Sequence, residues 1–296
     1  MLEFKPVRAE DKELIDGYLK QIETRSCDMA FASIYLWRSH YHMEYAECGD
    51  MIVFRSNEER MSFSFPIGGG DPIPAIEEIK KYCCGLGIPC VFHSITKDME
   101  EYLNLHYPGE FEIEYDRDAA DYVYETQALI ELKGKKYHGK KNHINKFIKT
   151  YDWAYEEIGP DNLEECLEML SLWKRDNCEK EDPELVAEIC VSECALREKD
   201  ALGLKAGLIR ADGRVVAFSV GEMIHPDTFC VHIEKAFADV QGAYPMINQQ
   251  FLIHEAAGCQ YVNREDDVGD PGLRKAKLSY HPAFMVEKAV AVAKEL

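Results

Sequence analysis

The sequence predicts a mixed α/β protein with a mixed sheet, organised as two tandem domains of similar architecture. The chain has 296 residues, which is long for one domain and sufficient for two that each bury a core. Segments with helical spacing of apolar residues alternate with short β-like runs. The order of helices, strand meander and β-α-β segment occurs twice, which indicates domains at residues 1–125 and 126–296.

In the N-terminal domain, two helices precede a meander of three strands and a β-α-β segment. Asp71 and Pro72 are typical of the start of a helix, because Asp caps the first turn and Pro fits the first helical position. We expect helices at 10–23, 30–39, 72–82 and 97–106, and strands at 43–46, 51–55, 61–65, 90–93 and 111–115.

In the C-terminal domain, a polar turn at 116–121 is expected to precede a comparable order of elements. The best-defined element is a hairpin, because Asp212-Gly213 supplies the positive φ angles of a tight turn. We expect strands at 128–132, 153–158, 205–210, 215–222, 229–237, 260–264 and 284–292, and helices after 142, at 162–173, from Asp182-Pro183, up to Gly258 and from Pro271, which Asp270 caps.

Composition and the first residues predict a soluble cytoplasmic protein. The chain is 46% hydrophobic and 30% charged, and no segment reaches the ~18 uninterrupted apolar residues of a membrane span. The opening MLEFKPVRAEDKELI lacks the apolar core of a secretory signal. We therefore expect no transmembrane segment.

Neither a metal site nor a covalently bound cofactor is predicted from short motifs. The eleven cysteines include no CxxC spacing, and the ten histidines form no HExxH motif. Most of the cysteines, including Cys166 and Cys230, lie within apolar patterns that are typical of a reduced protein core.

The formal net charge of −20 argues against non-specific binding of DNA or anionic lipid, since the long-range field repels both. Against this background, residues 133–149 contain seven lysines and no acidic residue. Lysines at a helix start can follow a phosphodiester backbone, but a solvated helix face explains them equally well. The candidate residues for binding phosphate or nucleic acid are Lys136, Lys140, Lys141, Asn142 and Lys146.

Four segments resemble the C-terminal domain family of bacterial phosphatidylglycerol lysyltransferases. They are ADGRVVAFSVGE at 211–222, FCVHIEKAF at 229–237, QGAYPMINQQFLIHEAAG at 241–258 and NREDDVGDPGLRKAKLSYHP at 263–282. That family belongs to the GNAT (acyl-CoA N-acyltransferase-like) superfamily, which also contains FemABX aminoacyltransferases. The resemblance implies tandem GNAT-like domains and a transferase that uses aminoacyl-tRNA.

The sequence departs from these relatives in two respects. It lacks the membrane flippase region of the lysyltransferases, which weakens the expectation of a lipid acceptor. It also keeps only part of the Q/R-x-x-G-x-G/A loop of acetyltransferases, at Gln241 and Gly242, which weakens the expectation of coenzyme A as donor.

Acyl transfer to an amine requires a proton acceptor, donors for the developing oxyanion and a cradle for the phosphates of the donor. The acids and bases of the closing motif lie between a strand and a helix, where α/β sheets bind ligands. A turn held by salt bridges explains the same residues equally well. The candidates in this motif are Asp266, Asp267 and Tyr280 for catalysis, and Asn263, Arg274 and Lys277, with Gln241 and Gly242, for substrate binding.

Strand alternation provides further catalytic candidates in residues 229–237. Cys230, His232 and Glu234 share one face of this strand. His232 or Glu234 is a candidate base, as is Glu222 at the end of the neighbouring strand, although a hydrogen-bonded pair in the core explains each of them alone.

The leading hypothesis is an acyl- or aminoacyltransferase. It would move an acyl group from acyl-CoA or aminoacyl-tRNA to an amine or hydroxyl of an unidentified small molecule, peptide or lipid. The alternative is a noncatalytic protein that binds a nucleotide, tRNA or peptide on the same fold, because the pyrophosphate loop is incomplete.

Overall fold

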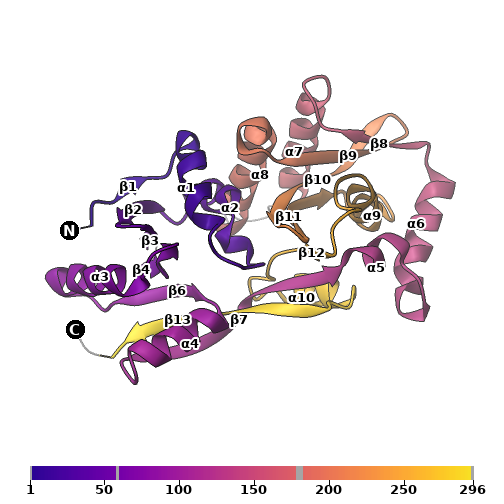
Figure 1. Ribbon diagram of the computed structural model, residues 1–296. Helices are drawn as coiled ribbons and strands as arrows, with labels where there is room; N and C mark the ends of the chain where they lie inside the picture. The colour runs from indigo at the N-terminus through magenta and orange to yellow at the C-terminus, as the bar shows by residue number, and fades with distance from the viewer. Residues whose placement is uncertain (1, 58–59, 178–182, 295–296) are drawn as a thin grey trace. The chain divides into compact units, whose positions relative to one another are not determined.

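The computed structural model describes residues 2–57, 60–177 and 183–294 (Figure 1). The chain forms two compact units. The first consists of Met1–Asp121, Asp266–Arg274 and Met285–Leu296, and the second of Tyr122–Glu265 and Lys275–Phe284. The predicted boundary at 125 lies close to this first break. The division differs from the predicted one in that two C-terminal segments belong to the first unit.

The first unit contains a mixed sheet in which β4 and β6 are parallel and the other described pairs are antiparallel. The parallel pair is connected through α3 (Pro72–Leu86), so that β4, α3 and β6 form a β-α-β unit. The strands follow the order β1 (Lys5–Pro6), β2 (Glu44–Cys48), β3 (Met51–Asn57), β4 (Met61–Ser64), β6 (Val91–Ile95) and β13 (Phe284–Ala293), and β5 (Ile67–Gly68) pairs with β3.

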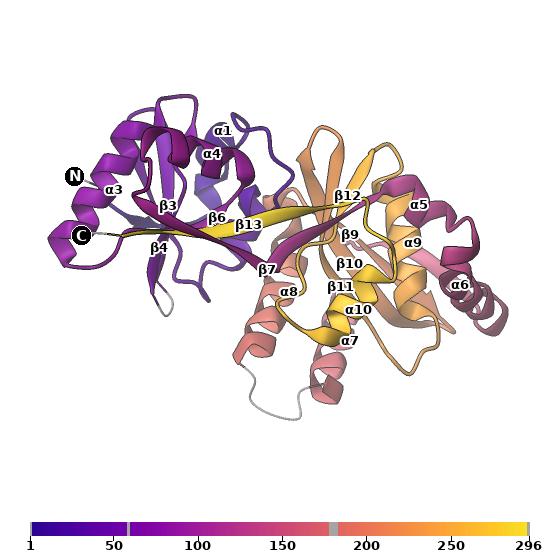
Figure 2. The same cartoon turned by 90° about the horizontal axis from the view of Figure 1, so that it is seen from below.

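Helices cover both faces of this sheet (Figures 1 and 2). Helix α3 starts as predicted, since Asp71 accepts a hydrogen bond of 3.1 Å from the Ile73 amide and Pro72 is the first helical residue. Its apolar face buries Ile76 and Ile79 in a core with Phe63 and Phe92. The other helices of this unit are α1 (Lys12–Leu19), α2 (Phe31–Leu36) and α4 (Lys97–His106).

The second unit repeats this arrangement. Strands β11 and β12 are parallel and are connected through α9 (Ala243–Glu255), which packs on β9, β10 and β11 (Figure 1). The predicted hairpin is present as β9 and β10. The strand order is β7 (Phe111–Glu125), β12 (Tyr261–Asn263), β11 (Thr228–Ala236), β10 (Arg214–His225), β9 (Lys205–Ala211) and β8 (Trp153–Glu157).

Five further helices contain residues of the second unit, and α7 and α8 pack against each other. None of the helices in the described part of the chain is both long enough and apolar enough to cross a membrane. Asp182, the predicted start of α8, lies outside the described residues. These helices are α5 (Thr126–Glu131), α6 (His138–Thr150), α7 (Leu163–Asn177), α8 (Pro183–Leu202) and α10 (Pro271–Leu278).

Two predicted elements are wrong. Residues 128–132 form part of helix α5 and not a strand, because a short apolar run does not distinguish the two and Leu132, at φ +46°, ends the helix. Residues 116–121 continue β7 and do not form a turn. There, tertiary contacts outweigh local polarity, since buried Asp121 binds Lys288 at 2.7 Å.

Candidate active site

A β-bulge in the second unit places His232 at an irregular position of the sheet. Val220 pairs with Ile233 and Gly221 with Val231, so His232 is the extra residue of β11. Gly221 permits this close approach, because a Cβ atom there would lie 2.2 Å from the Cys230 carbonyl oxygen. Parallel pairing with β12 ends at Cys230 and Asn263. His232 therefore lies beyond the last paired residues of β11 and β12.

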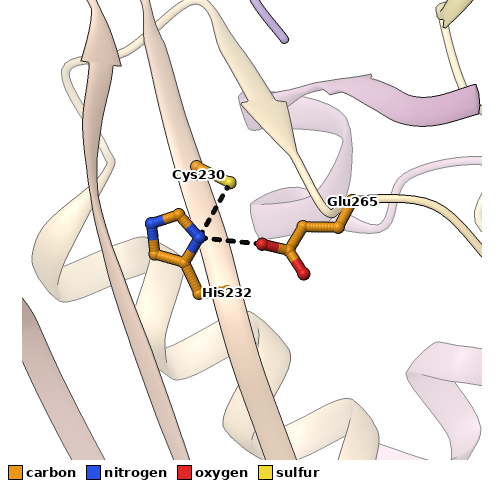
Figure 3. Close-up of side chains that lie close together, drawn as sticks. All are labelled: Cys230, His232 and Glu265. Carbon is orange, nitrogen blue, oxygen red and sulfur yellow. Dashed lines mark hydrogen bonds and ion pairs between the residues drawn. The ribbon is translucent and has the colours of Figure 1, made fainter. Parts of the chain in front are cut away.

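His232 contacts three polar side chains, which with it are called the His232 cluster; Figure 3 shows two of them, Cys230 and Glu265. Its Nδ1 lies 2.8 Å from Glu265 Oε1 and 3.6 Å from Cys230 Sγ. Its Nε2 lies 3.3 Å from Glu222 Oε1. The His232 side chain is 3% exposed, and Glu222 is 12% exposed. Two predicted candidates, Glu222 and His232, are therefore in contact.

The electrostatics of the His232 cluster favour a protonated imidazole. Burial alone lowers the pKa of His232, but Cys230, Glu222 and Glu265 outweigh burial and raise this pKa well above its ordinary value. Both ring nitrogens face carboxylates, which agrees with an imidazolium that donates from each nitrogen. The His232 imidazolium can therefore exchange protons with a reacting molecule through the carboxylates of Glu222 and Glu265.

The same cluster contains the atom types of a metal site, which sequence motifs did not reveal. One ligand atom each from Cys230, His232 and Glu265 lie within 4.8 Å of one another. Thiolate, imidazole and carboxylate are the ligands that zinc prefers, and Glu222 on the other ring nitrogen would orient the imidazole. Cys230 and Glu265 are far apart in sequence, so no short motif records their contact.

Glu234 belongs to a second polar group of this unit. Its carboxylate accepts hydrogen bonds from Arg264 at 2.9 Å and from Asn248 of α9 at 3.0 Å. The Arg264 guanidinium stacks over the ring of Tyr280, 5.0 Å from its centroid. Burial raises the pKa of Tyr280 above its ordinary value. Arg264 thus connects the predicted candidates Glu234 and Tyr280. Arg264 itself was not among the residues predicted from the sequence.

A pocket of about 470 Å³ opens at the N-terminus of α9 and is called the α9 pocket. It brings together three residues that were predicted separately, Lys140, Gln241 and Gly242. Gly242 has φ +91°, and a Cβ there would lie 2.6 Å from the His143 carbonyl oxygen, so glycine is required. The lining residues are Lys140, His143, Phe237, Ala238, Val240 and 241–245.

Lys140 is the half-buried cation of the α9 pocket. Burial lowers its pKa, the charge of Arg264 lowers it further, and Glu234 partly opposes both. An anion in the pocket would stabilise the charged lysine. The other lysine-block candidates, Lys136, Lys141, Asn142 and Lys146, have exposed side chains and are not among the residues that line this pocket.

The closing motif is divided between the two units. Asp266, Asp267 and Arg274 belong to the first unit, whereas Asn263, Lys277 and Tyr280 belong to the second.

Most residues of this motif hold the loop in place. Asp267 is fully buried and accepts two hydrogen bonds from Arg274, at 2.6 and 2.9 Å. Lys277 Nζ donates to the Arg264 carbonyl at 2.7 Å, and Asn263 Oδ1 accepts from the Glu265 amide at 2.7 Å. These bonds correspond to the salt-bridged turn that the sequence left open as an alternative.

The first unit contains a separate cavity of about 340 Å³, called the first-unit cavity. Asp266 is the one predicted site residue that lines it. Sequence reasoning missed the rest because they come from five separate segments of the chain. The lining residues are Asp28, Met29, Ser33, Ile34, Trp37, Tyr41, Met43, Phe54, Ser56, Ser62, Ser64, His93, Ser94, Ala119, Asp266 and Lys288.

The chain matches a protein family and is similar to a known protein and to solved structures. A family model described as phosphatidylglycerol lysyltransferase, C-terminal, matches residues 19–292. An uncharacterised protein of Mycoplasmoides gallisepticum is 26% identical over 179 residues, which are 57% of this chain. The match spans 55% of that protein, about half of its length.

Among solved structures, a conserved protein of unknown function from Bacteroides thetaiotaomicron is 35% identical, with 99% of this chain and 100% of that chain covered and a TM-score of 0.94. L-PGS from Bacillus licheniformis is 14% identical, with 97% and 93% covered and a TM-score of 0.65. A tandem GNAT protein from the clavulanic acid biosynthesis pathway is 8% identical, with 99% and 98% covered and a TM-score of 0.53. The fold is thus the predicted tandem GNAT fold.

Proposed function

Because this chain belongs to the family of phosphatidylglycerol lysyltransferase C-terminal domains, we propose that it transfers an acyl or aminoacyl group from a phosphate-bearing donor to an amine or hydroxyl acceptor. The donor is an aminoacyl-tRNA or an acyl-CoA. The observation that most supports this proposal is the convergence of Lys140, Gln241 and Gly242 on the α9 pocket.

The α9 pocket has the properties of a binding site for a donor phosphate. The first backbone amides of a helix and its dipole favour an anion at the N-terminus. Lys140 adds a cation whose pKa burial has lowered, so that a bound phosphate would restore part of the lost stabilisation. Gly242 lets the start of α9 approach the backbone of His143, which also lines the pocket.

Transfer to an amine requires one bond to form and one to break. The amine nitrogen bonds to the carbonyl carbon of the donor, and the carbon–oxygen or carbon–sulfur bond of the donor breaks. One N–H proton leaves the nitrogen, and one proton reaches the departing oxygen or sulfur. The His232 cluster supplies groups that accept and donate these protons, since its imidazole lies between the carboxylates of Glu222 and Glu265.

The test is turnover on a panel of charged tRNAs and acyl-CoAs, with the wild-type chain, Lys140→Ala and Lys141→Ala. We expect transfer from one donor class, and for Lys140→Ala an increase in the KM for that donor of about tenfold or more, as expected for the loss of one charged phosphate contact. Lys141→Ala removes the same charge from the exposed neighbour and should leave KM within about twofold, as most exposed charges do.

Two results would speak against the proposal. An absence of turnover on every donor, while the donors still bind with an affinity that depends on Lys140, would indicate the noncatalytic binding protein. Equal effects of the two lysine variants would mean that the α9 pocket does not hold the donor phosphate.

A further inference from the structure

The first-unit cavity is lined by both polar and aromatic side chains. Its volume of about 340 Å³ is in the range that holds small ligands. Its lining includes serines from β3, β4 and β6, namely Ser56, Ser62 and Ser94. The cavity is therefore suited to a small molecule with both polar and apolar parts.

The charges at this cavity are unbalanced toward the negative. Lys288, 2% exposed, binds Asp121 at 2.7 Å and Asp28 at 2.9 Å, and Asp266 is a third carboxylate close to it. Burial works against the charge of Lys288, but these carboxylates hold its pKa well above the ordinary value. Counting buried Asp121, which binds Lys288 but is not among the lining residues, three carboxylates and one ammonium give the group a formal charge of −2.

The histidine of the cavity does not reduce this imbalance. Burial lowers the pKa of His93 to about 4, so the ring is neutral at physiological pH. Its Nδ1 lies 2.8 Å from Ser62 Oγ. Of the described residues that line the cavity, Lys288 alone is cationic.

Aromatic rings also line the cavity. Trp37 and Tyr41 both line the cavity, and their ring centroids are 5.6 Å apart. Aromatic faces attract ammonium groups, and the attraction strengthens as water is excluded. A lining that combines the carboxylates of Asp28 and Asp266 with aromatic rings is thus complementary to an organic cation and unfavourable for an anion.

Backbone strain occurs at a residue that lines this cavity. Ser94 has φ +53°, a conformation that non-glycine residues seldom adopt, and its side chain is hydrogen-bonded to Asp28. Such strain typically costs about 1–3 kcal/mol and concentrates at ligand sites. This feature is independent of the charge balance and occurs at the same cavity.

We propose that the first-unit cavity binds a small molecule through a primary ammonium group, held by the carboxylates of Asp28 and Asp266 and by the rings of Trp37 and Tyr41. That this molecule is the acceptor of the acyl group, and hence an amine, rests on the function proposed above. Binding of the ammonium itself does not depend on that function.

The experiment measures binding of three four-carbon probes to the full chain by calorimetry. The probes are 1,4-diaminobutane, 1,4-butanediol and succinate, which share a length and differ in terminal charge. We expect diaminobutane to bind about tenfold or more tightly than butanediol, as for one charged hydrogen bond, and succinate to show no binding. Equal binding of diaminobutane and butanediol, or binding of Ca²⁺ without the diamine, would overturn the proposal.

Variants localise the site. Asp266→Asn keeps the shape of the side chain and should weaken diaminobutane binding about tenfold, and Trp37→Leu about fivefold. Glu287→Gln removes one charge from an exposed neighbour of Lys288 in sequence and should leave the affinity unchanged. Unchanged affinity in both Asp266→Asn and Trp37→Leu, with unaltered melting temperatures, would refute the assignment. Diamine binding without acyl transfer would remove only the acceptor role.

Discussion

The ammonium group of Lys140 lies over the ring of Tyr280, 4.0 Å from the ring centroid. Both residues belong to the second unit, and each was a candidate from a different part of the sequence. The contact orients the lysine beside the α9 pocket and keeps it close to Arg264 and Glu234. The α9 pocket and Glu234 are therefore physically linked through Lys140.

This contact predicts how Tyr280 can be replaced. Tyr280→Phe keeps the aromatic face and should retain the KM for the donor within about twofold, whereas Tyr280→Leu should raise it about fivefold through loss of the cation–π contact. Steady-state kinetics of both variants provides the measurement. A large loss of kcat in Tyr280→Phe would instead assign the hydroxyl a direct role in proton transfer.

The raised pKa of His232 predicts a pH-dependent contribution to stability. A group with a raised folded-state pKa stabilises the fold fully below its unfolded pKa of about 6.5 and loses this contribution as pH rises through the folded value. The loss of stability in His232→Gln should therefore be largest near pH 6 and smaller at alkaline pH. Urea denaturation across this range measures it, and a difference independent of pH would contradict the charged imidazole.

Gly221 should tolerate no side chain, because the added Cβ would lie 2.2 Å from a backbone oxygen of the bulged strand. We expect Gly221→Ala to destabilise the chain by about 1–3 kcal/mol, as overpacking does. Gly139→Ala in α6 is the matched control, since a Cβ there meets no atom within 4 Å. Thermal unfolding of both variants tests the bulge, and equal melting temperatures would be inconsistent with it.

Lys288 should be essential for the first unit. Lys288→Met leaves Asp121 and Asp28 without their buried cation and should cost about 3–5 kcal/mol of folding free energy. Lys294→Met, at an exposed position further along the chain, should cost less than about 0.5 kcal/mol. Chemical denaturation of both variants gives the comparison. A stable Lys288→Met chain would show that the ion pairs of Lys288 contribute little to the folding free energy.

Metal removal should leave the proposed transfer intact. The Cys230, His232 and Glu265 atoms already contact one another, with His232 Nδ1 2.8 Å from Glu265 Oε1, and the sequence predicts no metal site. We expect equal turnover before and after dialysis against a chelator, and less than one metal ion per chain by elemental analysis. Stoichiometric zinc that disappears in Cys230→Ala would reverse this expectation and make the cluster a metal centre.

Local signals in the sequence were sufficient for most elements. The Asp71-Pro72 helix start and the Asp212-Gly213 hairpin depend on contacts between near neighbours, and both are present. Strand alternation in β11 correctly grouped Cys230 with His232. The failure at 116–121 arose where a distant partner, Lys288 for Asp121, decided the conformation. The failure at 128–132 arose because a short apolar run does not distinguish a helix from a strand.

The sequence by itself determined the fold class, the family and a short set of polar candidates, because periodicity, turn chemistry and motifs are properties of neighbouring residues. Tertiary structure alone decided which candidates meet. It joined His232 to Glu222 and Glu265 and brought Lys140 to Gly242. It also assigned buried Asp267 to an ion pair with partly exposed Arg274, since this pairing depends on a folded backbone that no local pattern encodes.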